Sequence, residues 1–184
     1  MNLITLKKQN IEYAIFGSYI YNESKAKDID VLIIESNIKP VNNIYDFQYI
    51  SKDVFIAHLK KCDIRALECI FSPQSNFIED YEKFIDWSYL RSAISQKSSH
   101  SYVKAKKKMS KENEIYIGQK SLYHSLRILL FGIQLAKYKK IINFSEANHY
   151  LEKIMLIENW NDLELIYKKE YNRLHSEFKL ACPK

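Results

Sequence analysis

The spacing of apolar residues changes near residue 50 of this chain, and that change constrains the fold more than any other feature of the sequence. Before it, three short segments rich in β-branched and aromatic residues predict strands, at Ile11–Gly17, Asp28–Glu35 and Ile44–Ile50. After it, apolar residues recur at the intervals of three and four that are typical of an amphipathic helix. Strands followed by helices indicate an α+β protein, so we expect a small mixed β-sheet flanked by helices and then a helical C-terminal lobe.

Most of the chain after residue 50 is expected to be helical. Ser51 is a candidate N-cap for the first of these helices, and Pro73 would end the second. The expected helices are Ser51–Lys61, Asp63–Phe71, Phe77–Ile94, Gln119–Tyr138, Ser145–Ile157 and Asn161–Leu180. The segment Ser98–Asn113 is polar and rich in lysine, which favours a loop or a broken helix. We place the boundary of the two lobes near residue 75, which gives a first lobe with the expected strands at residues 1–75 and a helical lobe at residues 76–184.

Composition limits the class of protein. A chain of 184 residues with 47% hydrophobic and 27% charged residues is typical of a globular protein with its own core. No apolar run has the length of a membrane span, and Met1–Asn10 lacks the apolar stretch of a signal peptide. Three cysteines without metal-ligand spacing are typical of free thiols in a reducing compartment, so we expect a cytoplasmic protein.

Charge is divided unevenly along the chain. Residues 1–97 carry a net charge of −1 and residues 98–184 carry +7, which together give the formal charge of +6. A slightly acidic half joined to a basic half suits a metal site that faces a polyanion. A solvated basic surface without a partner would give the same distribution.

The segment Phe16–Leu32, FGSYIYNESKAKDIDVL, carries the residues that point to chemistry. One expected strand ends at Gly17-Ser18, and after a spacer of nine residues the next begins with Asp28 and Asp30. Side chains alternate along a strand, so both carboxylates point to one face, about 6–7 Å apart, where their oxygens can bind divalent cations. Gly17 leaves room for a phosphate to approach the backbone, and Ser18 would open a short helix whose N–H groups and hydroxyl can bind phosphate oxygens. A tight strand connection with two solvated aspartates is the alternative.

This arrangement resembles the signature of the nucleotidyltransferases of the DNA-polymerase-beta superfamily. Their signature is a hydrophobic strand, Gly-Ser, a spacer, and then Asp-hydrophobic-Asp-hydrophobic. The resemblance implies an enzyme that uses two metal ions, Mg²⁺ or Mn²⁺, to transfer a nucleoside monophosphate from a nucleoside triphosphate to an acceptor hydroxyl, with release of pyrophosphate. Asp28 and Asp30 would then be metal ligands, and Gly17 and Ser18 would hold phosphate. Two cations can stabilise the attacking and leaving oxygens of such an in-line displacement.

Two further segments narrow the resemblance. The end of the second expected helix, Leu67–Pro73 (LECIFSP), is similar to the Leu-Glu-hydrophobic-Phe/Trp-Ser-Pro ending found in the RNA-ligase-associated (RlaP-like) group of predicted nucleotidyltransferases. Lys120–Leu130 (KSLYHSLRILL) is similar to that group's helix with lysine followed by Tyr-His-x-x-Arg. With the first motif, these segments cover residues from about 11 to 140, and they make RNA the favoured acceptor.

The match departs from the pattern in two places. Many relatives follow Gly-Ser with arginine, whereas here the residue is Tyr19, which removes one phosphate contact. The third carboxylate is not self-evident. Asp46, at the start of the third expected strand, is the first choice, since superfamily members place it on the strand beside Asp-x-Asp, where it would also help to deprotonate the acceptor. Glu68 is the alternative, since a glutamate among apolar residues needs a partner if it is buried.

The helix Gln119–Tyr138 predicts a phosphate-facing surface. At 100° per residue, Lys120, His124 and Arg127 fall within about 60° of each other. Leucines gather on the opposite side, so one face would pack and the other would present basic side chains to the triphosphate. An ordinary solvated helix face is the alternative interpretation. The lysine cluster Lys104–Lys108 is open to the same two interpretations, since it could bind triphosphate or an RNA backbone or could simply be solvated.

Two other classes of protein remain open. A catalytically inactive nucleotidyltransferase-fold protein that binds nucleotide or RNA would share the fold and the basic face. A helical interaction protein would carry Asp-x-Asp by accident. The sequence leaves open the acceptor (tRNA, other RNA, protein or small molecule), the preferred base and the oligomeric state.

Overall fold

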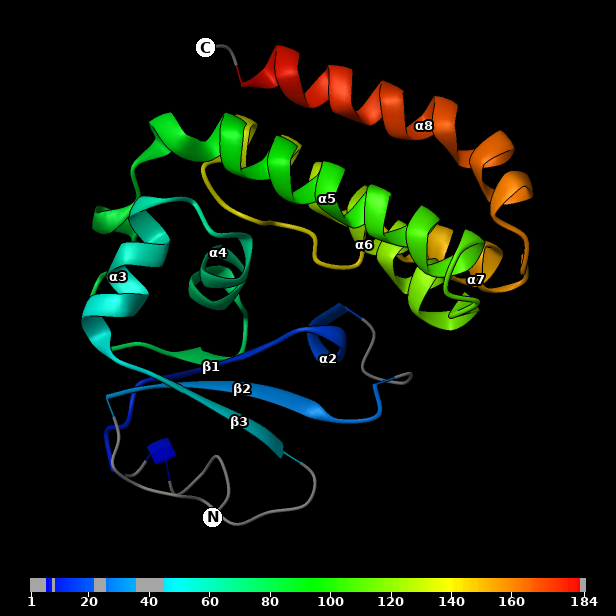
Figure 1. Cartoon of the computed structure of the whole chain (residues 1–184). Helices are drawn as coiled ribbons and strands as arrows, with labels where there is room; N and C mark the ends of the chain where they lie inside the picture. Colours follow the sequence, from blue (N-terminus) through cyan, green and yellow to red (C-terminus); the bar gives the residue numbers. More distant parts are fainter. Residues whose placement is uncertain (1–5, 8, 22–25, 36–44, 183–184) are drawn as a thin grey trace. The chain divides into compact units, whose positions relative to one another are not determined.

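A computed structural model describes residues 6–7, 9–21, 26–35 and 45–182 of the chain (Figure 1). The chain divides into two compact units, Met1–Tyr89 and Leu90–Lys184. The first contains a mixed β-sheet with helices and the second is helical, which confirms the α+β class.

The sheet of the first unit has four strands in the order β3-β2-β1-β4. The strands are β1 (Tyr13–Phe16), β2 (Ile29–Ile34), β3 (Tyr45–Ile50) and β4 (Ser75–Asn76). β1 pairs antiparallel with β2 and β4, whereas β2 and β3 are parallel. The three strands expected from the sequence are therefore present, and within the described residues the sheet gains the two-residue β4, which was not expected.

The two faces of this sheet differ in chemistry because side chains alternate along each strand. One face carries Tyr13, Ile15, Val31 and Ile33, which form a buried core with Leu6. The opposite face carries two apolar residues of β2, Leu32 and Ile34, and the two aspartates Asp30 and Asp46. We call this second side the carboxylate face.

The helices of the first unit that bear on the site are α2 (Ser18–Tyr21), α3 (Lys52–Lys60) and α4 (Ile64–Phe71). Figure 1 shows α3 and α4 on the same side of the sheet. Ser51 caps α3 by accepting a hydrogen bond from the Val54 N–H (3.4 Å), which confirms the N-cap expected from the sequence. Asp63 caps α4 in the same way through the N–H groups of Arg65 and Ala66.

The segment after α4 stays with the first unit, so the two units divide later in the chain than the expected position near residue 75. Phe77 and Tyr81 pack against Phe55 of α3, with ring centroids 5.8 and 5.2 Å away. Leu90–Ile94 are helical as expected, but the helix expected to begin at Phe77 is wrong for residues 77–89. This stretch instead holds two short 3-10 turns, Glu82–Phe84 and Trp87–Tyr89, before the next helix begins.

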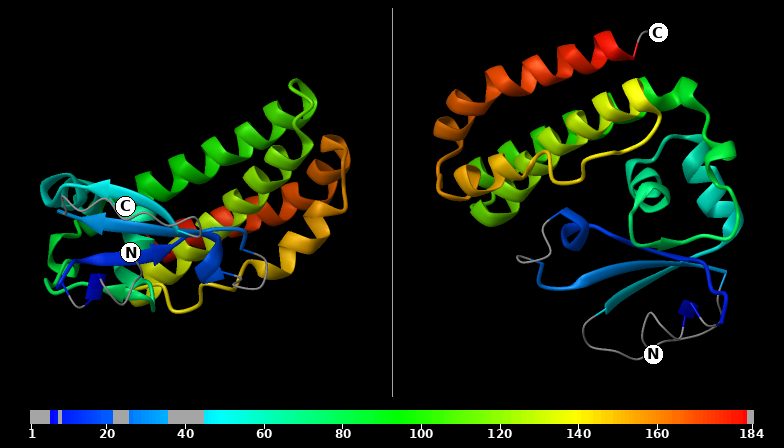
Figure 2. Two further views of the ribbon diagram at one scale, coloured as in Figure 1. Left: turned by 90° about the horizontal axis from the view of Figure 1, so that it is seen from below. Right: turned by 180° about the vertical axis from the view of Figure 1, so that it is seen from behind.

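The second unit is built around one central helix. Its helices are α5 (Leu90–Ser110), α6 (Ile115–Tyr138), α7 (Asn148–Met155) and α8 (Trp160–Ala181). Helices α5, α7 and α8 all pack against α6, and the further views in Figure 2 show α5 and α6 running alongside each other. α5 is continuous through Ser98–Ser110, so the loop or broken helix expected there is wrong.

Within the part of the chain that the structure describes, none of the helices combines the length and the apolar character that crossing a membrane requires.

Candidate active site

Asp30 and Asp46 are direct neighbours on the carboxylate face. Asp30 lies in β2 and Asp46 in the parallel strand β3, and the two residues are paired in the register of the sheet. Adjacent strands lie about 4.8 Å apart, and paired residues project to the same face, so the two carboxyl groups stand side by side. Asp46 is exposed and Asp30 is partly exposed, which leaves their oxygens accessible to a ligand.

Gly17 provides the space in which the Asp30 carboxyl group lies. A Cβ atom at position 17 would clash with Asp30 Oδ2 and would lie 3.3 Å from Asp30 Cγ. The backbone of Gly17 also has φ +76°, in the left-handed region that favours glycine. The glycine of the Gly-Ser motif is therefore required twice, by its own conformation and by the carboxylate across the sheet.

The remaining residues of the first motif, Ser18 and Asp28, are close in sequence to Gly17 and Asp30. Asp28 is exposed and precedes β2, which begins at Ile29, so it is not part of the strand as expected. Ser18 is exposed and opens α2 directly after Gly17. The structure thus brings Gly17, Asp30 and Asp46 together and leaves Asp28 and Ser18 next to them in sequence.

The residues on the carboxylate face fit a divalent cation by their chemistry, since two adjacent carboxylates offer the hard oxygen ligands that Mg²⁺ and Mn²⁺ prefer. The absence of a side chain at Gly17 also suits a cation site, because it leaves a recess for the Asp30 carboxyl group that any larger residue would fill. Across the described residues, no three His, Cys, Asp or Glu side chains converge closely enough to hold a metal.

Glu68, the alternative third carboxylate, has a structural partner. Its side chain is 4% exposed on α4, and it accepts a hydrogen bond from the Tyr21 hydroxyl of α2. This contact supplies the partner that a buried carboxylate requires. It joins α4 to the helix that carries Ser18, which favours a supporting role for Glu68 over metal ligation.

Arg65 is a basic residue on the carboxylate face that the sequence patterns did not indicate. It lies in the first turn of α4, and its Nη1 donates to Gln48 Oε1 of β3 at 2.8 Å. Its guanidinium also lies over the Phe16 ring of β1, 5.9 Å from the centroid. No periodicity or motif marks this arginine; only the position of α4 over the sheet does.

The buried thiol of Cys69 lies close to the charged residues Glu68, Arg65 and Asp30, which affect its pKa. Burial raises the pKa of the Cys69 thiol well above its usual value, and the adjacent Glu68 carboxylate raises it further. Arg65 acts in the opposite direction and Asp30 in the same direction, so both charges lie near this one side chain. Cys69 is therefore protonated and inert at neutral pH.

In the second unit, the basic residues expected on one face of α6 differ in exposure. Lys120 is exposed, His124 is half-buried, and Arg127 is only 8% exposed. Arg127 Nη2 lies 2.6 Å from His124 Nδ1, and its guanidinium lies over the rings of Tyr123 and Phe131 at 5.5 and 5.9 Å. The basic face expected on this helix is therefore more buried than the sequence indicated, because α6 is packed on several sides.

His124 lies among positive charges from both helices. Burial lowers its pKa well below the usual value, and Arg127 and the α5 residues Lys97 and Lys104 lower it further. The imidazole is therefore neutral at pH 7, and Nδ1 can accept a hydrogen bond from Arg127. No sequence pattern marked Lys97, and its position on α5 adds it to this group. We call Lys97, Lys104, Lys120, His124 and Arg127 the α5–α6 basic cluster.

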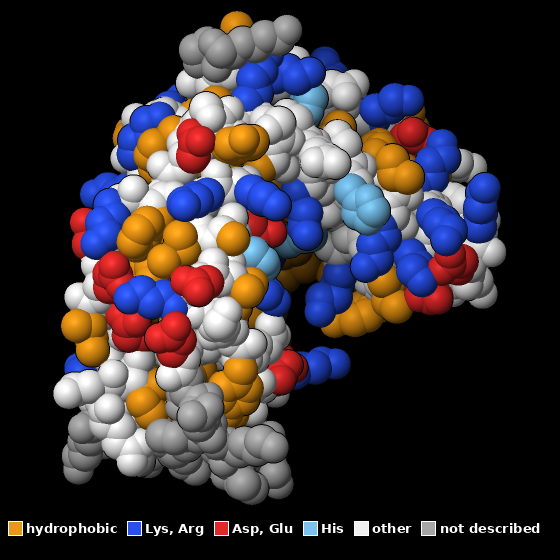
Figure 3. Space-filling view, turned by 60° about the vertical axis from the view of Figure 1, so that its left-hand side comes forward, with side chains coloured by type: hydrophobic (Ala, Val, Ile, Leu, Met, Phe, Trp, Pro, Cys, Tyr) orange, Lys and Arg blue, Asp and Glu red, His pale blue; other side chains and the backbone are white. Residues whose placement is uncertain are grey.

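The lysine cluster Lys104–Lys108 divides into paired and unpaired members. Lys106 pairs with Glu164 at 3.8 Å, and Lys107 pairs with Glu112 at 2.9 Å. Lys108 pairs with Glu112 and Glu114. Lys104, by contrast, forms no ion pair with any residue that the structure describes, and neither do Lys97 and Lys120. Figure 3 shows many Lys and Arg side chains on the visible surface, several of them beside histidines.

The fold and these side chains define an α+β protein with a mixed four-stranded sheet, a pair of adjacent aspartates and a separate basic cluster. No family model, curated protein or solved structure matches the chain.

Proposed function

We propose that this protein is a metal-dependent nucleotidyltransferase that transfers a nucleoside monophosphate from a nucleoside triphosphate to an acceptor hydroxyl of RNA. The observation that carries the proposal is the pairing of Asp30 with Asp46 on one face of the sheet, with the Asp30 carboxyl group seated against Gly17. A glycine followed by two aspartates on neighbouring strands, here Gly17, Asp30 and Asp46, is also what the resemblance to the polymerase-beta superfamily implies.

Asp30, Asp46 and Asp28 are the residues that would hold two Mg²⁺ or Mn²⁺ ions. When bound, these ions neutralise charge on the phosphates. In the transfer, the acceptor oxygen forms a bond to the α-phosphorus, the bond from that phosphorus to the bridging oxygen breaks, and pyrophosphate leaves. Asp46 is the more exposed of the strand aspartates, so it is our choice for the base that receives the acceptor proton.

Phosphate binding is proposed within each unit by itself, through Gly17 and Ser18 in the first unit and through the basic residues of α6 in the second. Gly17 leads directly into α2, where the exposed Ser18 hydroxyl can donate to a phosphate oxygen. Lys120, His124 and Arg127 supply the donors of the second unit, with Arg127 held in one orientation by His124 and two aromatic rings. Such pre-orientation reduces the entropy lost when a phosphate is bound.

RNA is favoured as the acceptor by the charge of the second unit. Lys97 and Lys104 add two cations without a described carboxylate partner to the α6 residues. A polyanionic backbone is attracted to such a surface independently of its sequence.

An inactive protein that binds nucleotide or RNA is the second candidate. One observation favours it: among the described residues, Asp30 and Asp46 are not joined by a further carboxylate, such as Asp28, in a group of three that could hold a metal. Such a protein would bind nucleotide and RNA through the same residues without releasing pyrophosphate.

The experiment is to incubate the full chain with each of the four nucleoside triphosphates, labelled on the α-phosphate, together with Mg²⁺ or Mn²⁺ and total RNA. We expect label to appear in RNA, in parallel with pyrophosphate, and neither product to form in EDTA. Binding of nucleotide without either product would establish the inactive candidate. Labelling of a protein or small molecule would retain the chemistry and change the acceptor.

A further inference from the structure

The position of Arg65 follows from the register of the sheet. On the carboxylate face, Phe16, Asp30 and Asp46 form one row across β1, β2 and β3, because Phe16 pairs with Asp30 and Asp30 pairs with Asp46. Gln48 lies two residues beyond Asp46 on the same face of β3.

The Arg65 side chain makes contacts at both ends of this arrangement. It bonds to Gln48 on β3 and stacks over Phe16 on β1, so its guanidinium must lie above β2, the strand that carries Asp30. The opposing effects of Asp30 and Arg65 on the Cys69 thiol are consistent with this position. The cation therefore stands next to the paired aspartates.

The guanidinium retains most of its hydrogen-bonding capacity in that position. Arginine has five N–H donors in a planar fork. Within the described chain, the Arg65 side chain donates to Gln48 alone, and it forms no ion pair with a carboxylate. The residue is also exposed, so the remaining donors can reach a ligand.

We propose that Arg65 binds a non-bridging oxygen of the transferred phosphoryl group, the α-phosphate that reacts above Asp30 and Asp46. This rests on the proposed nucleotidyltransferase function. A fixed guanidinium matches phosphate geometry by two parallel N–H donors, and it offsets the negative charge that the two aspartates add to the site. Gln48 and Phe16 are then positioning residues, since they hold the guanidinium without touching the nucleotide.

The test compares Arg65→Ala, Arg65→Lys and Gln48→Ala with Lys60→Ala, an exposed lysine of α3 that serves as the control for loss of one positive charge. Two quantities are measured on the full chain: kcat/KM for nucleotidyl transfer, and the Kd of a nucleoside triphosphate analogue with a methylene bridge between the α- and β-phosphorus, which cannot be cleaved. Loss of a charge-assisted hydrogen bond predicts a roughly ten- to hundredfold lower kcat/KM and a weaker analogue affinity for Arg65→Ala. Gln48→Ala should show a smaller loss in both quantities, and Lys60→Ala should show none.

Guanidine separates direct contact from a structural role. Millimolar guanidinium ions should restore part of the activity of Arg65→Ala, while methylammonium should not, and Arg65→Lys should lie between wild type and Arg65→Ala. A melting curve for each variant shows whether the fold is kept. Wild-type kcat/KM and analogue affinity in Arg65→Ala would overturn the Arg65 assignment while leaving the transferase intact. If the wild-type chain neither transfers nucleotide nor binds the analogue, the proposed function itself fails, and the Arg65 assignment fails with it.

Discussion

Position 17 requires glycine for two independent physical reasons. Its φ of +76° is strained for any residue with a Cβ, and that Cβ would occupy the space of the Asp30 carboxyl group. We predict that Gly17→Ala lowers the free energy of unfolding by about 1–3 kcal/mol, measured by urea unfolding. Nucleotide transfer should fall with it, because Asp30 must move.

A double-mutant cycle separates the two reasons. Asp30→Ala removes the oxygen that a Cβ at position 17 would meet, so Gly17→Ala should cost less stability in the Asp30→Ala background than in wild type. The remaining cost belongs to the backbone conformation. Equal costs in both backgrounds would show that Asp30 does not occupy the recess.

Lys120 and Arg127 share a helix face but differ in burial, so their replacements should separate stability from binding. Lys120→Ala should change the free energy of unfolding by less than about 0.5 kcal/mol, because Lys120 is exposed. Arg127→Ala should cost about 1–3 kcal/mol, because Arg127 packs against Tyr123 and Phe131. Both should weaken triphosphate binding roughly ten- to hundredfold, with affinity for an uncharged nucleoside unchanged.

Leu126→Ala is the matched control for that experiment. Leu126 is fully buried on the same helix, so its truncation should cost about 2–5 kcal/mol without a specific loss of phosphate affinity. If both basic variants bind triphosphate as wild type does, α6 does not contribute to the phosphate site, and the α5–α6 basic cluster would serve the acceptor alone.

At the scale of elements, α5 shows why part of the fold could not be predicted from the sequence. Its buried positions include Ile94, Ser98, Ser101, Ala105 and Met109, which follow helical spacing. Three of these five are serine or alanine, so the stripe that packs does not stand out as apolar. Ser98 is buried because its hydroxyl donates to the Ser125 carbonyl of α6 at 3.0 Å, a contact that only the tertiary structure provides.

The prediction of a helix directly after α4 was wrong for the opposite reason, because the apolar pattern is helical and the structure is not. The aromatic residues of this segment have helical spacing, but two aspartates compete for the backbone N–H groups that a helix would use. Asp80 accepts from the Glu82 N–H at 3.1 Å, and Asp86 accepts from the Ser88 N–H at 3.1 Å. The chain therefore forms two 3-10 turns, while Phe77 and Tyr81 pack against Phe55.

The residues of the candidate site could be predicted where they belong to one local motif. They could not be predicted where their positions depend on strand register or on helix packing. Gly17 and Asp30 belong to one motif, and alternation along a strand places the aspartate correctly. The choice of Asp46 came from a resemblance, and its position beside Asp30 depends on the parallel register of β2 and β3. Arg65 and Lys97 depend on helix packing, so no local pattern identified them.

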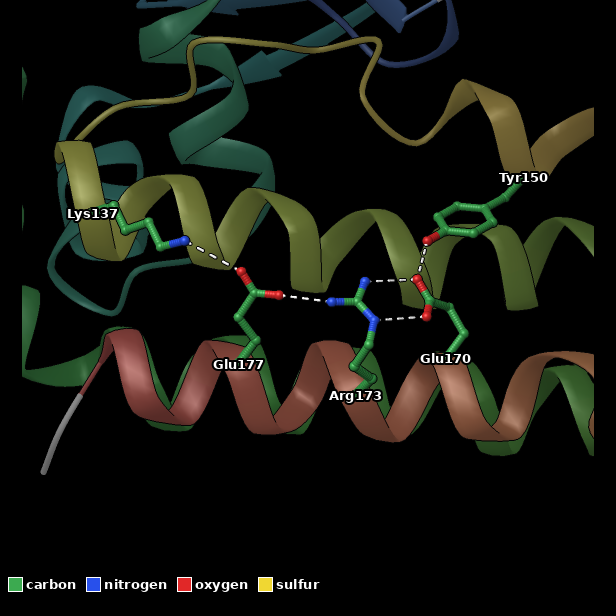
Figure 4. Close-up of polar contacts among 5 residues, drawn as sticks. All are labelled: Lys137, Tyr150, Glu170, Arg173 and Glu177. Carbon is green, nitrogen blue, oxygen red and sulfur yellow. Dashed lines mark hydrogen bonds and ion pairs between the residues drawn. The ribbon is translucent and has the colours of Figure 1, made fainter.

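Three helices of the second unit are joined by one polar network, shown in Figure 4. Glu170 of α8 accepts two hydrogen bonds from Arg173, both of 2.8 Å, and one from the Tyr150 hydroxyl of α7. Arg173 also pairs with Glu177 at 2.9 Å, which pairs with Lys137 of α6 at 3.2 Å. The network fixes α8 to both neighbouring helices.

This network predicts a specific pH dependence. The hydrogen bonds from Arg173 lower the pKa of Glu170 to about 2, below the usual 4.5 of the unfolded carboxyl. The stabilisation is therefore present above pH 4.5 and is lost as the pH falls through about 2. Glu170→Gln should be less stable than wild type by about 1–2 kcal/mol at pH 7, after allowance for partial exposure, and equally stable near pH 2.

Urea unfolding at both pH values measures the effect, with Glu158→Gln as the control, since Glu158 is an exposed carboxylate just before α8. A Glu170→Gln stability loss that persists unchanged at pH 2 would mean that the ionised carboxylate is not its source.

At the scale of the whole molecule, charge divides with the two units. Residues 1–89 carry 10 Lys and Arg against 13 Asp and Glu, whereas residues 90–184 carry 18 against 9. An acidic unit with the paired aspartates and a basic unit suit a metal-dependent reaction on a polyanion. Replacing both Lys97 and Lys104 by alanine should weaken RNA binding and reduce its salt dependence, by about one unit of log–log slope per lysine that contacts a phosphate.

Lys107→Ala is the control for that measurement, because its ammonium group is already paired with Glu112. If Lys107→Ala weakens RNA binding as much as the loss of Lys97 and Lys104 does, binding depends on net charge and not on the α5–α6 basic cluster.

The measurement that tests the central claim most directly is the rate of pyrophosphate release by wild type, Asp30→Asn, Asp46→Asn and Asp53→Asn, with melting curves for all four. Asp53 is an exposed aspartate of α3 outside the site, so it controls for the loss of one carboxylate charge. We predict that Asp30→Asn and Asp46→Asn each lower the rate by about a hundredfold or more, that Asp53→Asn leaves it unchanged, and that all melt as wild type does. Undiminished pyrophosphate release by Asp30→Asn and Asp46→Asn would contradict the assignment of the paired aspartates as the active centre.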